Sequence, residues 1–251
     1  MINALLLLGI AHGLGDYLLQ PDRLARRKQK ELRFLLLHGL LYALAMASMF
    51  LLDVSGAVWA CWGIASATHL GIDWIRVRIC RRKQRTALLQ LVSFCADQAL
   101  HLGVLAGLWA LLLPHTTGAL AAWSGTVWLR PALVYAAIFC VIWKPAAILI
   151  RLFFAWFVPA GAGAAQAAKP ASEAQTVPGS GELIGKLERL IIAVLVLCDQ
   201  FGAIGFVLTA KSVARFKLIE ENRDFAERYL VGTLLSTVIA LLTALLLRKL
   251  L

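Results

Sequence analysis

The first apolar run of the chain contains three polar residues at helical spacing. In the stretch AHGLGDYLLQ, which covers residues 11–20, His12, Asp16 and Gln20 follow one another at intervals of four. Residues four apart on an α-helix lie on the same face, so these side chains are predicted to form one polar stripe. A histidine and an aspartate one turn apart can reach the same divalent cation, and zinc, manganese and iron all accept this pair of ligands.

The same pairing occurs twice more in the first half of the chain. HLGID places His69 four residues before Asp73, and DQALH places Asp97 four residues before His101. A further histidine, His38, lies near the start of the second apolar run. The candidate metal ligands are therefore His12, Asp16, His38, His69, Asp73, Asp97 and His101.

These residues could hold one divalent ion with hydrogen-bonding partners around it, or two ions. If Asp16 or Asp97 is not a ligand, it is the candidate general base of a hydrolytic reaction. Gln20 and Gln98 are expected to form hydrogen bonds to the ligands. The alternative is that each His/Asp pair is a polar contact between helices that holds no ion.

The elements that carry these residues are predicted to be membrane-spanning helices. Of 251 residues, 61% are hydrophobic and 16% are charged, and the mean hydropathy is +0.78, unlike an ordinary soluble domain. A helix needs about 20 apolar residues to cross the hydrocarbon core. The runs that suit this length are residues 2–20, 34–52, 56–74, 87–113, 131–158, 184–210 and 230–247. The sequence thus predicts an all-α, polytopic transmembrane bundle with six or seven spans.

Basic residues are concentrated at the ends of these runs, so the net charge of +11 does not indicate nucleic acid as a partner. Residues 23–33 and 76–85 are short and strongly basic, whereas residues 53–56 are not. The positive-inside rule therefore places both basic loops in the cytoplasm and the N-terminus outside. At 1.5 Å per residue, the His and Asp residues then share the cytoplasmic half of the bilayer within a band of about 20 Å. Since an ionised side chain at the centre of a membrane helix costs at least about 2.5 kcal/mol, these groups are expected to share a partner. The small residues expected to let the third and fourth helices approach closely are Gly63, Ala67, Gly71, Gly103 and Gly107.

The second half of the chain does not fit simple alternation across the membrane. Segment 211–228 is basic, and it would lie outside if every run crossed once. Because Lys144 and Pro145 interrupt the run 131–158, we predict a broken or re-entrant helix there. The predicted parts are a four-helix module (1–113), an outer loop with the broken helix (114–158), a flexible linker (159–181), and C-terminal membrane helices with an amphipathic connector (182–251).

A second polar set lies in the C-terminal part and consists of Glu188, Arg189, Lys211 and Arg215. Its basic members could bind an anionic headgroup or phosphate of a substrate. The alternative is that these are ordinary charges at the membrane edge, where lysine and arginine are common.

The motifs HGLGDYLLQ, HLGID and DQALH, followed by IGKLERLI, AKSVARF and YLVGTLLS, resemble those of the bacterial membrane family catalogued as domain of unknown function 3307. The resemblance extends over nearly the whole chain apart from residues 159–181. It implies a multi-pass protein of the bacterial inner (plasma) membrane, and it implies no particular activity. By spacing alone, the paired His and Asp are also similar to those of membrane-bound metal-dependent hydrolase-like proteins.

The His and Asp residues support two functions of different classes. The first is an intramembrane hydrolase that needs a divalent metal and acts from the cytoplasmic side on a lipid-linked or membrane-proximal substrate. The second is a cation or proton-coupled transporter that uses the same residues, and a non-catalytic membrane scaffold is a third alternative. The outer halves of the first four runs are almost wholly apolar, which favours the enzyme, because a transport path needs polar groups on both sides.

Overall fold

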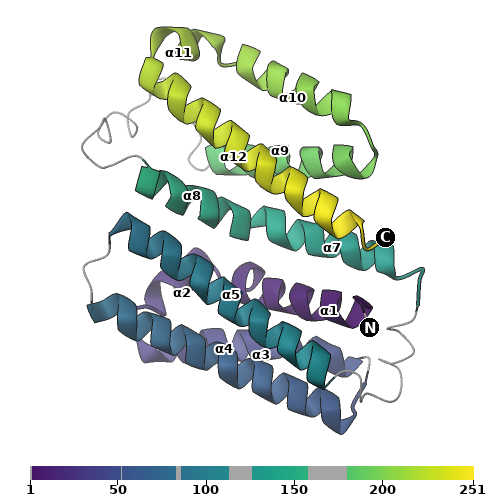
Figure 1. The fold of residues 1–251 in the computed structure, drawn as a ribbon. Helices are drawn as coiled ribbons and strands as arrows, with labels where there is room; N and C mark the ends of the chain where they lie inside the picture. The colour runs from purple at the N-terminus through teal and green to yellow at the C-terminus, as the bar shows by residue number, and fades with distance from the viewer. Residues whose placement is uncertain (1, 52, 83–85, 113–125, 158–179) are drawn as a thin grey trace. The chain divides into compact units, whose positions relative to one another are not determined.

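The computed structural model describes residues 2–51, 53–82, 86–112, 126–157 and 180–251 (Figure 1). All regular secondary structure in these residues is helical. The chain divides into two compact units, residues 1–140 and residues 141–249, and each is described on its own. The predicted linker 159–181 lies almost wholly outside the described residues, as does most of the predicted outer loop.

The first unit is a bundle in which helices that follow one another along the chain pack side by side. α3 packs against α4, α4 against α5, and α1 against both α3 and α5 (Figure 1). The elements of this unit are α1 (Ile2–Gly13), η1 (Leu14–Leu18), α2 (Asp22–Arg27), α3 (Leu32–Met46), η2 (Ala47–Leu51), α4 (Gly56–Arg82) and α5 (Ala87–Leu111), and α7 (Arg130–Trp143) begins in it.

One end of this bundle, near the N-terminus of α1, is an apolar core. The buried side chains there include Leu8, Met46, Val58 and Leu105, one from each of α1, α3, α4 and α5. Because lipid tails are as apolar as leucine, hydrophobic burial contributes little to association inside a membrane. Close van der Waals packing and polar contacts must therefore hold these helices together.

Close approach of the helices depends on two glycines in the first unit. A Cβ at Gly15 would lie 2.9 Å from Cδ2 of Tyr42 and 3.0 Å from its Cα, and one at Gly39 would lie 3.0 Å from Cδ1 of Leu70. The expectation for the glycines of the third and fourth helices is wrong. A Cβ would meet no neighbour within 4 Å at Gly63, Gly71, Gly103 or Gly107.

The first helix ends in a π-helical turn, η1. The N–H of Leu19 donates to the carbonyl of Leu14, five residues earlier, at 2.8 Å. A π turn holds one residue more than an α turn, so it rotates the side chains that follow about the helix axis. Asp16 lies in this turn, and the predicted α-helical stripe from His12 is therefore altered at Asp16.

Four helical stretches are long and apolar enough to cross a membrane: Leu32–Phe50, Ala87–Leu111, Arg130–Phe157 and Arg223–Arg248. The predicted run 2–20 corresponds to a shorter apolar helix, Ile2–Leu18. The predicted run 56–74 lies in α4, which has 27 residues but also carries polar and basic side chains. These helices support a membrane protein, and a total of six or seven spans stays a prediction.

The second unit begins within α7 and contains the remaining helices, which are α8 (Pro145–Phe157), α9 (Ser180–Leu197), α10 (Phe201–Val213), α11 (Phe216–Glu221) and α12 (Arg223–Arg248). α12 packs against α8, α9 and α11. Lys144 alone separates α7 from α8, and Pro145, which has no N–H to donate, begins α8.

The predicted run 184–210 is not one helix. α9 ends at Leu197 and α10 begins at Phe201. Between them Asp199 has a φ of 58°, in the left-handed region that aspartate tolerates better than most residues. Lys211 near the end of α10 donates to Glu188 of α9 at 2.6 Å, so α10 returns along α9 as a hairpin. Because the turn has only three residues, it hardly changes the average hydropathy of the run, and hydropathy therefore does not predict it.

Candidate metal centre

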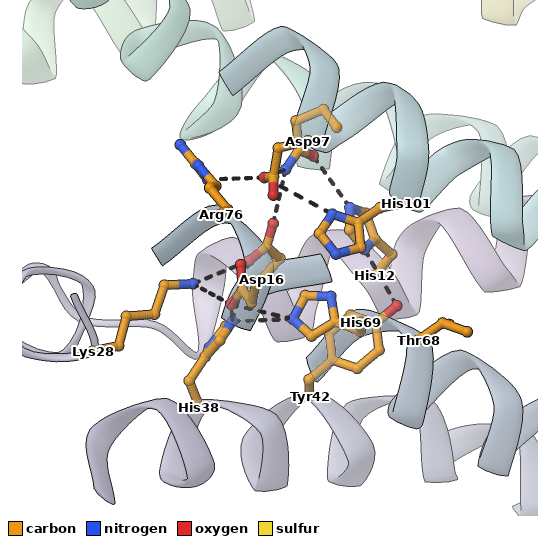
Figure 2. A network of polar contacts seen from close by, with 12 residues as sticks. His12, Asp16, Lys28, His38, Tyr42, Thr68, His69, Arg76, Asp97 and His101 are labelled. Atoms are coloured by element: carbon orange, nitrogen blue, oxygen red, sulfur yellow. Dashed lines mark hydrogen bonds and ion pairs between the residues drawn. The ribbon is translucent and has the colours of Figure 1, made fainter. Parts of the chain in front are cut away.

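The predicted ligands meet inside the first unit (Figure 2). They come from α1, η1, α3, α4 and α5, and each is buried, with at most 5% of its surface exposed. The site lies directly beside the apolar core. Tyr42 shows this, since it is part of the core and also hydrogen-bonds to His12.

His38 has the most crowded position in this group. Its Nε2 lies 3.1 Å from Nε2 of His69, 3.3 Å from Oδ1 of Asp16 and 3.2 Å from Oδ2 of Asp73. A single N–H on this nitrogen cannot serve three acceptors, whereas a cation bound by all four atoms would satisfy each of them. With N and O ligands at about 2.0–2.1 Å, a tetrahedral zinc site has neighbouring ligand atoms about 3.3–3.4 Å apart. The three distances around His38 are close to this spacing.

The ligand atoms form two groups of three, within each of which they lie within 4.8 Å of one another. The first group contains Asp16, His38 and His69, and the second contains Asp73, Asp97 and His101. Asp73 links the two groups, because its Oδ2 also approaches His38. Either group has the ligand types that suit zinc, manganese or iron.

His12 belongs to neither group, and its hydrogen bonds explain why. The amide nitrogen of Gln98 donates to Oδ2 of Asp16 at 3.0 Å and to Oδ2 of Asp97 at 3.1 Å, so Oε1 of Gln98 faces Nε2 of His12, 3.2 Å away. His12 Nε2 must then carry the hydrogen. Its Nδ1 accepts from the hydroxyl of Tyr42 at 3.3 Å. Both ring nitrogens of His12 are thus used without a metal, in contrast to the ligand role that the spacing predicts.

Two basic side chains that the sequence analysis assigned to cytoplasmic loops reach into the site. Lys28 Nζ lies 2.7 Å from Oδ2 of Asp73 and 3.9 Å from Oδ1 of Asp16, and Arg76 Nη1 donates to Oδ2 of Asp97 at 2.8 Å. With all five groups ionised, three carboxylates and two cations leave a net charge of −3 + 2 = −1. One divalent ion is therefore sufficient to neutralise the site, and two would give it a large positive charge.

The sequence held a signal for one of these cations. Arg76 follows Asp73 by three residues and so lies on nearly the same face of α4. Lys28 had no such signal, because it lies in the turn directly after α2, and only the fold of that segment brings its side chain to the carboxylates. Tyr42 was missed for a similar reason, since an aromatic residue in an apolar run is typical of packing.

Three polar atoms of the second group have no hydrogen-bond partner among the described residues. They are Oδ1 of Asp97 and both ring nitrogens of His101. His101 Nδ1 lies 3.9 Å from Oδ2 of Asp97, which is beyond hydrogen-bond distance. A buried polar atom left unpaired costs about 1–3 kcal/mol, so a bound polar group is expected beside these atoms.

The other predicted polar residues have different surroundings. Gln20 is buried just after η1. Arg189, in the second unit, is 3% exposed and donates to the carbonyls of Ile142 and Trp143, so it satisfies the end of α7 rather than facing outward. In the same unit, Lys211 pairs with Glu188, and the cationic groups of Lys211 and Arg215 lie 5.3 and 5.8 Å from the centre of the Tyr229 ring.

Sequence comparison gives a family for the unit that carries this site. The family described as "Protein of unknown function (DUF3307)" matches residues 4–129, which are 126 of the 251 residues. The chain belongs to the DUF3307 family. The matched DUF3307 region contains every candidate ligand together with Lys28 and Arg76, and it ends before α7. The C-terminal motifs of the predicted resemblance lie outside it. No curated protein and no solved structure matches the chain.

Proposed function

We propose that this DUF3307 protein is an intramembrane hydrolase that depends on one divalent cation, which is zinc, manganese or iron. It acts from the cytoplasmic side on a lipid-linked or membrane-proximal substrate. The observation that carries the proposal is the position of His38 Nε2, 3.1–3.3 Å from a second imidazole nitrogen and two carboxylate oxygens. Hydrogen bonding alone leaves that arrangement unsatisfied, and metal coordination satisfies it.

The ion-binding residues in this proposal are Asp16, His38, His69 and Asp73. Lys28 neutralises part of the carboxylate charge and positions Asp73 through their 2.7 Å contact. Gln98 positions Asp16 from the other side and is fixed in turn by His12. The ion would polarise a water molecule and lower its pKa towards about 7, which makes hydroxide available at neutral pH.

Asp97 is the general base in this scheme. Both oxygens of Asp16 are occupied by contacts to Gln98 and His38, whereas Oδ1 of Asp97 has no partner among the described residues. Asp97 takes a proton from the attacking water as the water oxygen bonds to the phosphorus or acyl carbon of the substrate. The bond to the leaving oxygen breaks, and that oxygen takes a proton from His101 in its imidazolium form, whose two nitrogens have no other partner among the described residues. Asp97 then passes the proton it took from water to His101, which restores both groups.

Transport by the same residues is the competing function. A path across the membrane needs polar groups on both sides of the site. On the side towards the N-terminus of α1, the neighbours of the site are the buried apolar residues of the core, including Leu8, Met46, Val58 and Leu105. A site closed on that side supports the hydrolase over the transporter.

Metal content tests the proposal directly. Elemental analysis of the purified protein by mass spectrometry should find one zinc, manganese or iron ion per chain. His38→Gln and His69→Gln should each weaken metal binding by at least about 10–100-fold, because each removes a proposed ligand and loss of a ligand's hydrogen-bond partner alone has an effect of that size. Asp97→Asn should keep the metal and lose hydrolysis, because it removes the base and leaves the ligands in place.

Asp199→Asn provides the matched control, because Asp199 is 60% exposed and pairs with Arg248 in the second unit. It should bind metal as the parent does. If the parent holds no more metal than His69→Gln, the metal-dependent function is wrong and the His/Asp pairs are contacts between helices.

A further inference from the structure

A cavity of about 240 Å³ lies between α4 and α5 in the first unit. Its walls come from one face of each helix, and one of its ends reaches the candidate metal centre. The residues that line it are Ile72, Ile75, Arg76 and Ile79 of α4, and Ser93, Ala96, Asp97 and Leu100 of α5.

The apolar wall of this cavity continues onto the outside of the bundle. Ile75 is 52% exposed, Ile79 is 51% exposed and Leu100 is 57% exposed. Residues 76–82, which the sequence predicts as part of a loop, continue α4 as a helix, so these aliphatic side chains extend the apolar surface of α4 and α5. Exposed aliphatic side chains of a membrane protein pack favourably against acyl chains, so a lipid beside α4 and α5 could reach the cavity.

The polar part of the cavity is formed by Arg76 and Asp97. The side chain of Arg76 is 30% exposed and that of Asp97 is 3% exposed, so the pair connects the outside of the bundle to its interior. Arg76 donates from Nη1 to Asp97, and the ring of Phe94 lies 6.0 Å from its guanidinium carbon. A guanidinium has five N–H groups, and within the described part of the chain no further hydrogen bond from Arg76 is present. The remaining donors suit a phosphate, which arginine binds through two parallel hydrogen bonds.

We propose that this α4–α5 groove binds one lipid with a phosphate headgroup, which enters sideways from the bilayer. The phosphate binds Arg76 beside Asp97, and the hydrocarbon chain lies along Ile75, Ile79 and Leu100. This places a phosphate ester next to the proposed general base. The inference names the substrate class of the proposed hydrolase and rests on that function for the reaction, although binding of the lipid does not need the metal.

The composition of the groove decides between a lipid and a water-soluble anion. Among the described residues, Arg76 is the one cationic side chain that lines it, and most of the other lining residues are aliphatic. A soluble phosphate compound would have to leave water for these apolar walls, which costs free energy for every polar group that stays unpaired. A lipid already carries an apolar chain that matches the walls and one charge that matches Arg76.

Lipid binding can be measured by native mass spectrometry of the full chain in detergent. The probes are phosphatidic acid and a phosphatidylcholine with the same acyl chains. Phosphatidic acid should bind in preference, because its exposed phosphate can reach Arg76. Arg76→Gln should weaken that binding by about tenfold or more, the usual effect of losing a charged hydrogen bond.

Arg78→Gln is the matched control for charge. Arg78 is two residues away on the same helix, does not line the groove, and lies with its guanidinium carbon 4.9 Å from the centre of the Trp74 ring. It should bind phosphatidic acid like the parent. Equal binding by Arg76→Gln and Arg78→Gln would overturn the proposal.

A second pair of variants tests the groove without touching its charge. Ala96→Phe fills the groove from α5 and should reduce binding of phosphatidic acid by about tenfold. Ala99→Phe, on an exposed position of the same helix that does not line the groove, should leave binding unchanged. Because Ala96→Phe keeps the Arg76–Asp97 pair, it also answers the concern that Arg76→Gln misfolds. If Ala96→Phe binds the lipid as Ala99→Phe does, the groove is not the binding site.

Two further measurements identify the preferred lipid and separate lipid binding from the proposed metal-dependent hydrolysis. Competition between phosphatidic acid and a polyprenyl phosphate shows which hydrocarbon chain the groove prefers. The same binding assay on metal-stripped protein and on His69→Gln should give unchanged lipid affinity. If the parent binds the lipid but holds no metal, the proposed hydrolase is wrong and the lipid-binding groove is supported. If the parent holds metal but its lipid binding does not depend on Arg76, the groove is wrong and the metal-dependent function is still supported.

Discussion

Lys28 shows how much a single buried residue can contribute to this site. Its side chain is 8% exposed, and its ammonium group lies beside two buried carboxylates, those of Asp16 and Asp73. A buried ion pair gives little net stability when both partners are present, but loss of one partner leaves the other charge without compensation. Lys28 is therefore expected to be important for stability even though it need not contact the substrate.

We expect Lys28→Met to lower the free energy of unfolding by about 3–5 kcal/mol, the usual effect of breaking a buried pair. Added zinc should restore part of the loss, because a cation at the ligands would replace the missing charge. Thermal unfolding in detergent, with zinc and with a chelator, measures both effects.

Lys30→Met is the matched control, because Lys30 is exposed and lies two residues further along. The double variant Lys28→Met/Asp73→Asn should recover some stability, since it removes both charges of the pair. Equal unfolding temperatures for Lys28→Met and Lys30→Met would contradict the importance of this ion pair.

At the scale of the elements, the π turn η1 and its contact with α3 position Asp16. Gly15 lies in this turn, where its missing side chain lets the backbone approach Tyr42. Tyr42 also donates to His12 and stacks on the ring of His69 with centroids 3.6 Å apart. The contact between η1 and α3 therefore fixes three members of the polar network together.

Gly15→Ala should lower the free energy of unfolding by about 1–3 kcal/mol, because the new methyl group would overlap the backbone and ring of Tyr42. It should also weaken metal binding by moving Asp16. Gly9→Ala is the control on α1, where a Cβ would meet nothing within 4 Å, and it should stabilise the helix by about 0.5–1 kcal/mol. Unfolding and metal titration of the two variants provide the comparison. The change in the free energy of unfolding must be negative for Gly15→Ala and positive for Gly9→Ala.

At the scale of the whole molecule, the α9–α10 hairpin allows a topology in which the basic segment 211–228 obeys the positive-inside rule. Asn3 donates to the carbonyl of Thr126, so α7 begins at the same end of the first unit as the N-terminus. The stretch Arg130–Phe157 that follows is long and apolar enough to cross a membrane. Within the second unit, α10 returns to the side where α9 begins, and Arg248 at the end of α12 pairs with Asp199 in the α9–α10 turn. If α9 and α10 each cross the membrane, we predict by alternation that segment 211–228 faces the cytoplasm with the other two basic segments, as the positive-inside rule requires.

Cysteine labelling tests this topology. In a chain whose five native cysteines are replaced, Lys30→Cys and Lys217→Cys should react with a membrane-impermeant maleimide only after the cells are permeabilised. Val127→Cys and Asp199→Cys should react in intact cells, because both positions are exposed and the predicted topology places them on the opposite side. Labelling of positions 199 and 217 from the same side would show that α10 does not recross the membrane.

The sequence by itself determined the features that depend on short segments of chain. Hydropathy predicted the runs 34–52, 87–113, 131–158 and 230–247, and the structure has helical stretches there at Leu32–Phe50, Ala87–Leu111, Arg130–Phe157 and Arg223–Arg248. Composition is sufficient for this because a helix that faces lipid must be apolar along its own length. The period of the helix likewise predicted that His69 lies beside Asp73 and that Asp97 lies beside His101, and both pairs are 3.9 Å apart.

Only the tertiary structure decided which atoms of different helices face one another. In the structure, the two ring nitrogens of His12 hydrogen-bond to Tyr42 and Gln98. Lys28 and Arg76 pair with the carboxylates of the site. The run 184–210 is two helices with a turn at Asp199. Spacing within one helix fixes a face but not its partner. Hydrogen-bond direction, helix rotation at a π turn and charge neutralisation all depend on neighbours that are distant in the chain.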